Sequence, residues 1–152
     1  MEPTNVLKRT LKTSTASAPE KGYVGGNLEQ ITAACVSELM NAATTFHKLH
    51  LKVTGTGSYA AHKALNEAYD AFGDHADSLV EEYQGAEEKI IELPNTAPAE
   101  LNSVEDGLEH LRKLKDKINS LQSIMPHSEI VNLLDEAKST INGVKYKLLF
   151  LK

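Results

Sequence analysis

The chain has 152 residues, of which 41% are hydrophobic, and a formal net charge of -5. This length suits one well-buried core and is short for two. No run approaches the roughly twenty apolar residues of a membrane span, and the N-terminus lacks the apolar region of a signal peptide. We therefore expect a soluble, cytoplasmic protein with no membrane association. The single cysteine, Cys35, lies in an apolar stretch, which suits a small core residue better than a reactive thiol.

Residues 1–26 are rich in Thr, Ser, Ala and Pro, and they contain too little apolar area to order themselves. We interpret them as a mobile, mildly basic tail, with Lys8, Arg9, Lys12 and Lys21 against Glu2 and Glu20. Many such tails on one assembly could bind DNA phosphates with avidity, although Ser/Thr-rich tails commonly only solvate a protein. The remaining, acidic part of the chain argues against DNA binding by the core and suits a surface that collects cations.

Residues 27–152 are predicted to form one bundle of amphipathic helices. Asn27 with Gln30 resembles a capping box, and apolar residues at helical spacing follow until the first helix ends near 52–55. Ser58 can cap a second helix, whose apolar stripe continues to about Gly85.

The second and third helices are joined by a long connector, Gln84 to Asn102, which contains two prolines and has room for one short helical turn around Glu87 to Ile91. Ser103 and Asp106 open the third helix. Pro126 breaks the pattern, and a last apolar stripe from 130 to 148 forms a fourth helix that reaches the C-terminus. Because no segment has strand periodicity, we predict an all-α, ferritin-like four-helix bundle with a long crossover between the second and third helices.

Five candidate metal ligands gather at the end of the first predicted helix and along the second: His50, His62, Asn66, Asp77 and Glu81. At about 100° per residue, the last four of these fall on one stripe of the second helix, beside its apolar stripe. His62 and Asp77 are nevertheless separated by a rise of about 22 Å, which is too far for one ion. If imidazoles and carboxylates meet, two helices from two subunits must therefore run antiparallel.

Gly73 lies on the same stripe, where glycine costs about 1 kcal/mol relative to alanine. A close approach of another helix would explain it. Imidazole and carboxylate ligands together suit iron, zinc or manganese. No histidine of the chain has a glutamate three residues before it, so the pair of Glu-x-x-His motifs of an intrasubunit di-iron bundle is missing. Its absence favours a site between subunits.

Other residues have plainer interpretations. We expect His75, His110 and His127 to be structural or solvated. His47, one turn before His50, is either structural or takes part in the metal site. The series Asp70, Asp74 and Asp77 could instead be a solvated acidic face. The aromatic side chains that we assign to core or interface packing are Tyr69, Phe72 and Tyr83.

The pattern His50-x4-Gly55-x6-His62, followed by Asp77-x3-Glu81, resembles the signature of Dps, the DNA-binding proteins from starved cells, which belong to the ferritin-like superfamily. The resemblance covers roughly residues 27–152. It implies a hollow shell of twelve subunits, a homo-oligomer built from two-fold dimers, which oxidises ferrous iron with peroxide or oxygen and stores ferric mineral. It further implies that His50 and His62 of one subunit meet Asp77 and Glu81 of a two-fold-related subunit at a ferroxidase centre holding two iron ions.

Two positions depart from the family pattern. Leu51 stands where the family usually has an aromatic residue, and Asn66 stands where aspartate is common. An asparagine still offers a neutral oxygen, but without the negative charge it should bind iron more weakly. Iron oxidation could then be slow or absent. The alternatives are a catalytically silent shell that acts as a structural or DNA-compacting assembly, and a zinc-bound structural interface.

Overall fold

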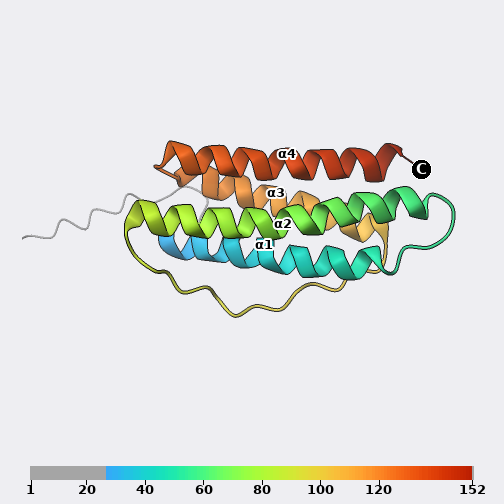
Figure 1. Cartoon of the computed structure of the whole chain (residues 1–152), viewed down its shortest axis with the longest axis horizontal. Helices are drawn as coiled ribbons and strands as arrows, with labels where there is room; N and C mark the ends of the chain where they lie inside the picture. The colour runs from blue at the N-terminus through green and yellow to red at the C-terminus, as the bar shows by residue number, and fades with distance from the viewer. Residues whose placement is uncertain (1–26, 152) are drawn as a thin grey trace, which may run out of the picture.

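The computed structural model describes residues 27–151 and contains four helices in that range. They are α1 (Leu28–His50), α2 (Ser58–Glu87), α3 (Val104–Ile124) and α4 (Ser128–Phe150) (Figure 1). No strand occurs among the described residues, so the prediction of an all-α, four-helix protein is confirmed. The expected mobile tail, residues 1–26, lies outside the described part of the chain.

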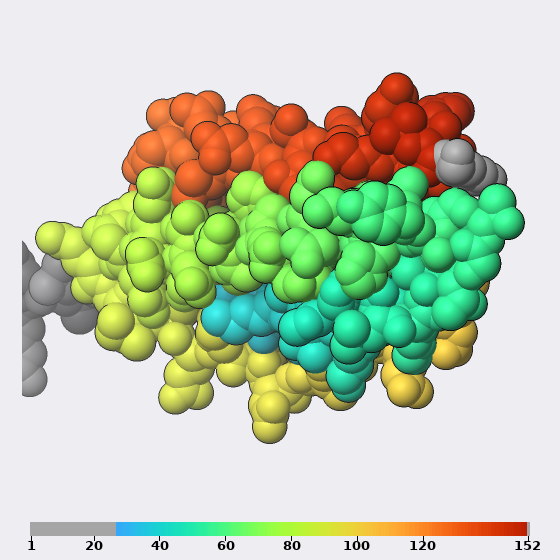
Figure 2. Space-filling view, turned by 45° about the vertical axis from the view of Figure 1, so that its right-hand side comes forward, coloured from blue at the N-terminus to red at the C-terminus, as the bar shows by residue number. Residues whose placement is uncertain are grey.

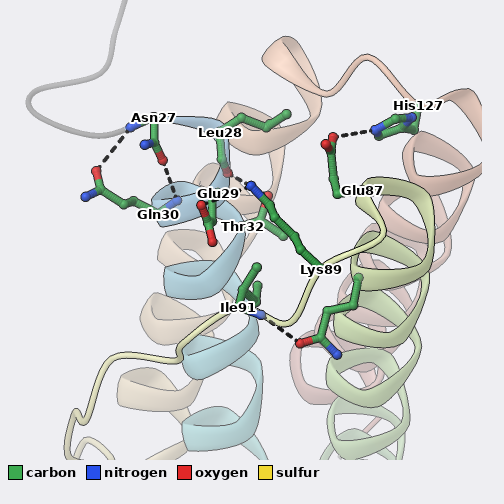
Figure 3. Close-up of polar contacts among 10 residues, drawn as sticks. Asn27, Leu28, Glu29, Gln30, Thr32, Glu87, Lys89, Ile91 and His127 are labelled. Atoms are coloured by element: carbon green, nitrogen blue, oxygen red, sulfur yellow. Dashed lines mark hydrogen bonds and ion pairs between the residues drawn. The ribbon is translucent and has the colours of Figure 1, made fainter.

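Side-chain caps set the starts of α1 and α3, whereas α2 and α4 begin without one. Asn27 accepts a hydrogen bond from the backbone N–H of Gln30, and the Gln30 side chain accepts one from the N–H of Asn27, so the predicted capping box is present (Figure 3). Ser103 caps α3 in the same manner, by accepting from the N–H of Asp106. The prediction for α2 was wrong in detail: Ser58 is the first helical residue, and the cap position is Gly57, which has no side chain with which to cap.

The four helices form a bundle in which α1 and α4 run in one direction and α2 and α3 in the other (Figure 1). α1 packs against α2 and α3, and α4 packs against the same two helices. The core between them is apolar and holds large side chains such as Phe46, Phe72, Leu65, Ile118 and Ile141, each with no exposed surface. The neighbouring helices are therefore antiparallel, which is a common solution for a bundle of this kind.

Because α2 and α3 point the same way, the segment between them must return along the bundle. Residues 88–103 lie beside α1 on that path (Figure 1). Polar side chains on one face of α1 and just after it hold this segment: Ser37 donates to the Pro94 carbonyl (2.8 Å), Asn41 to the Thr96 hydroxyl (2.7 Å), Thr45 to the Ala99 carbonyl (3.0 Å) and Lys52 to the Leu101 carbonyl (3.1 Å). Ser37 and Thr45 are both buried beneath the segment.

The separate helical turn expected around Glu87 to Ile91 is not formed. α2 continues to Glu87 and is ended by Glu88, whose φ of 54° is left-handed. The chain then turns so that Ile91 is buried and its N–H donates to the Gln84 side chain at 3.0 Å (Figure 3). An ion pair between Lys89 and Glu29 at 3.1 Å holds the start of this segment against α1. No helix in the range 27–151 is long and apolar enough to cross a membrane.

Candidate metal centre

His50 and His62 are brought together at one end of the α1–α2 pair. His50 is the last residue of α1, and its side chain is almost fully buried, with 6% of the residue exposed. His62 lies in the second turn of α2 and is half-buried. The centroids of the two rings are 4.4 Å apart. The family resemblance of the sequence, and not the spacing of the residues, implied that these two histidines from different helices serve one site.

The turn between the helices makes the meeting possible. Gly55 and Gly57 adopt φ values of 87° and 79°, in the left-handed region that glycine reaches without a steric penalty. The chain therefore reverses within a few residues after α1. α2 then starts close enough for the His62 side chain to reach the end of α1.

Backbone carbonyls fix the orientation of both imidazoles. Nδ1 of His50 lies 2.6 Å from the carbonyl oxygen of His47, and Nδ1 of His62 lies 2.9 Å from the carbonyl oxygen of His50. A carbonyl oxygen can only accept, so each Nδ1 must carry the proton and donate it. In the neutral imidazole, Nε2 then has its lone pair free, which is the form that binds a metal ion.

Two further aromatic side chains complete the cluster around these rings. Tyr69 stacks on His47, with centroids 4.1 Å apart and planes 14° apart, and its ring centroid is 5.0 Å from that of His50. Tyr69 packs against the core, as we expected from the sequence, but its stacking on His47 was not predicted. A signal was available, because Tyr69 follows His62 by seven residues, or two helical turns, and so lies on nearly the same face.

Asn66 lies one turn after His62 and is hydrogen bonded on both sides. Its oxygen Oδ1 accepts from the Tyr69 hydroxyl at 2.8 Å, and its Nδ2 donates to Asp70 at 3.1 Å. The amide is half-exposed. The Asn66 oxygen is therefore placed on the side of the aromatic cluster, while its nitrogen is turned toward a carboxylate.

Asp77 and Glu81 lie much further along α2 and are exposed. Fifteen residues of helix separate Asp77 from His62, a rise of about 22 Å. The structure therefore does not bring these carboxylates to the histidines of the same chain. Within residues 27–151, no group of three or more His, Cys, Asp or Glu side chains could hold a metal ion. One chain provides two imidazoles and a neighbouring amide, and a complete ligand set would need carboxylates from elsewhere.

Figure 2 shows the outer side of α2 as an open ridge between α4 and α1. Gly73 lies in the middle of this helix, and a Cβ atom added there would meet nothing within 4 Å. The close helix approach that we expected at Gly73 is therefore not made within the chain.

The remaining histidines have structural contacts. His75 lies 2.8 Å from the Thr140 hydroxyl on α4, and His127 lies 2.8 Å from Glu87 (Figure 3). Burial lowers the pKa of His75 and of His110 below the ordinary histidine value, which favours their neutral forms. These contacts agree with the structural interpretation made from the sequence.

Cys35 also has the structural place predicted for it. It is buried in the core, and burial raises the pKa of its thiol to about 12, with the nearby Glu38 acting in the same direction. The thiolate, which is the reactive form, is therefore strongly disfavoured in the folded chain.

The fold and cluster define an all-α bundle with a paired-imidazole site at one end. The model of a family described as a family of unknown function, DUF5856, matches residues 50–148. The chain belongs to this family, and the matched range contains all five candidate ligands. A comparison with curated proteins finds no match.

Proposed function

We propose that the protein is a ferroxidase of the Dps type, a ferritin-like bundle that assembles with copies of itself, oxidises ferrous iron between chains and stores the ferric product. The observation that carries the proposal is the pair formed by His50 and His62. Their rings lie together, and both Nδ1 protons are committed to backbone carbonyls, which leaves two Nε2 lone pairs for a metal ion. Such a hydrogen bond on the far nitrogen is typical of metal-binding histidines.

The missing ligands would come from a second copy of the chain. If two α2 helices cross antiparallel on their open sides, the His62 end of each faces the Asp77 and Glu81 end of the other. A two-fold axis between them would pass near the middle of this stretch, within about one helical turn of Gly73. Open space around Gly73 in the single chain supports a close crossing at that point.

The proposed ligand set contains two imidazole nitrogens, two carboxylates and the Asn66 oxygen. This mixture suits ferrous iron, and it also admits zinc or manganese. Two ferrous ions together supply the two electrons that reduce one hydrogen peroxide, which takes up two protons and yields two waters. The carboxylates of Asp77 and Glu81 favour the more highly charged ferric product. Consuming peroxide and ferrous iron together would protect the cell from oxidative damage, and a twelve-subunit hollow shell would hold the mineral.

One specific observation favours a second candidate function. Asn66 is a neutral amide where a carboxylate would bind iron more strongly, so the same assembly could keep its metal-bridged interface without rapid oxidation. The second candidate is therefore a zinc-bound or catalytically silent shell. DNA compaction by such a shell would depend on residues 1–26, which lie outside the described part of the chain. Metal analysis of the purified protein separates zinc from iron.

Mass measurement and ferrous titration test the proposal. The wild-type chain should sediment as a large homo-oligomer, and anaerobic addition of Fe²⁺ followed by peroxide should produce ferric absorbance. Asp77→Asn should lower the initial oxidation rate by about tenfold or more, because loss of even an outer-shell partner of a metal typically costs about tenfold to a hundredfold. Asp74→Asn is the matched control, because it removes the same charge from the exposed side of α2 three residues away. Equal rates in both variants, or a monomer with no oxidation, would overturn the proposal.

A further inference from the structure

Asn66 belongs to a chain of hydrogen bonds that runs from an exposed carboxylate to the aromatic cluster. Asp70 accepts from Nδ2 of Asn66 at 3.1 Å, and the Tyr69 hydroxyl donates to Oδ1 of Asn66 at 2.8 Å. The two partners bind the two ends of one amide. Together they fix the amide nitrogen toward Asp70 and the amide oxygen toward Tyr69.

The chemistry of the partners permits one orientation of the amide. An ionised carboxylate can only accept, so Asp70 must face the NH₂ group of Asn66. The oxygen is then left facing Tyr69, whose hydroxyl can donate. A flipped amide would place its oxygen against the Asp70 carboxylate and would lose a charge-assisted hydrogen bond, which is the stronger kind.

Tyr69 is itself held in place. Its ring stacks on His47 at 4.1 Å and lies 5.0 Å from the ring of His50. Tyr69 is half-buried, and the stack restricts the directions in which its hydroxyl can point. The position of the Asn66 oxygen is thereby tied to the position of the imidazole rings.

We propose that Tyr69 and Asp70 are positioning residues, which hold the Asn66 oxygen toward the imidazole cluster and make it a neutral ligand for a divalent cation bound by His50 and His62. This inference rests on the proposed metal site and deepens it. Asp70 also places a negative charge one hydrogen bond behind that ligand, and polarisation through the amide makes the oxygen a better donor. The negative charge of the Asp70 carboxylate thus partly compensates for the neutral side chain of Asn66.

Binding of Co²⁺ to the assembled, full-length protein tests the inference, with the visible absorption of bound Co²⁺ as the readout. This band responds to the number and kind of ligands and does not depend on catalysis. Tyr69→Phe keeps the stacked ring and removes only the hydroxyl. Asp70→Ala removes the carboxylate, and Asp74→Ala is its matched control, one turn further along α2 and also exposed. Thermal unfolding of each variant checks that the fold is kept.

Tyr69→Phe and Asp70→Ala should each weaken Co²⁺ binding roughly tenfold and change the absorption band, as removal of a residue behind a metal ligand commonly does. Asp74→Ala should leave both unchanged. Because Tyr69 is proposed to act through Asn66, Tyr69→Phe should have little further effect in an Asn66→Ala background, which is the signature of coupled residues.

The outcomes separate this inference from the proposed function. If His62→Ala abolishes Co²⁺ binding while Tyr69→Phe binds as the wild type does, the positioning role is overturned and the metal site stands. If Tyr69→Phe is equally damaging with and without Asn66, Tyr69 acts by another route and the inference also falls. If the wild-type protein and His62→Ala bind Co²⁺ equally poorly, the metal site and the positioning role fall together.

Discussion

Replacing Gly73 with alanine should have opposite effects on the single chain and on its assembly. Gly73 lies in the interior of α2, and an added Cβ would meet nothing within 4 Å. Glycine in a helix interior costs about 1 kcal/mol relative to alanine. In the isolated chain Gly73→Ala should therefore raise the free energy of unfolding by about 1 kcal/mol, or raise Tm by about 3 °C.

In the proposed two-fold pair, the same methyl group would enter a close helix crossing. Overpacking a contact commonly costs about 1–3 kcal/mol, and the symmetry of the pair introduces two methyl groups at once. A cost of about 1.4 kcal/mol, which lies inside that range, already corresponds to a tenfold weaker association. Gly73→Ala should thus stabilise the chain and weaken the pair.

The two effects can be measured separately. Urea unfolding at dilutions where the chain is monomeric reports its own stability, and sedimentation over a range of protein concentrations reports association. Gly143→Ala is the matched control, because Gly143 lies in α4 and its added Cβ also meets nothing within 4 Å. It should raise stability and leave association unchanged. If Gly73→Ala behaves as Gly143→Ala does, the two copies do not cross closely at Gly73.

Three further predictions concern the bundle itself. Gly107→Ala places a Cβ 3.0 Å from the buried Leu49 side chain. The Gly107→Ala protein should therefore be less stable in urea unfolding than the Gly143→Ala protein, by about 1 kcal/mol or more. Equal stability of the two variants would show that Leu49 moves aside freely. Because burial lowers the pKa of His75, the unfolded state takes up a proton before the folded state does as the pH falls below about 6.5. The urea concentration at the unfolding midpoint should therefore be lower at pH 5.5 than at pH 7.5. His75→Gln should reduce this difference, and an equal difference in both proteins would contradict the lowered pKa of His75. The Cys35 thiol, with its pKa raised to about 12, should react with a disulfide reagent at pH 8 only after denaturant is added, so prompt reaction of the folded chain would be inconsistent with its burial.

The parts of the fold that the sequence predicted are those decided by local contacts. Asn27 and Ser103 cap their helices through side chains that lie within three residues of the groups they bind, so the pattern in the sequence contains the whole interaction. The end of α2 was predicted less well. It depends on Ile91 being buried against the bundle and on Glu88 accepting a left-handed conformation, and neither follows from neighbouring residues.

The candidate site also contains features that the sequence indicated and features that depend on how the helices pack. The rings of His50 and His62 lie together because a short turn joins their two helices, and the sequence indicated their joint role only through the family resemblance. The stacking of His47 on Tyr69 depends on how α1 and α2 rotate against each other, which periodicity does not determine. The structure does not bring Asp77 and Glu81 to the histidines of their own chain. The partner that we propose for them would belong to a second copy.

Mixed assemblies of two defective chains test the central claim, that one metal site is shared between two copies. One chain would carry His50→Ala and His62→Ala, and the other Asp77→Asn and Glu81→Gln, with both expressed together in equal amounts. Neither assembly alone should oxidise Fe²⁺ at the site. In a random mixture, about a quarter of the sites would combine intact histidines from one chain with intact carboxylates from the other, so roughly a quarter of the wild-type activity should return. Mixed assemblies no more active than either parent would show that the histidines and carboxylates do not meet.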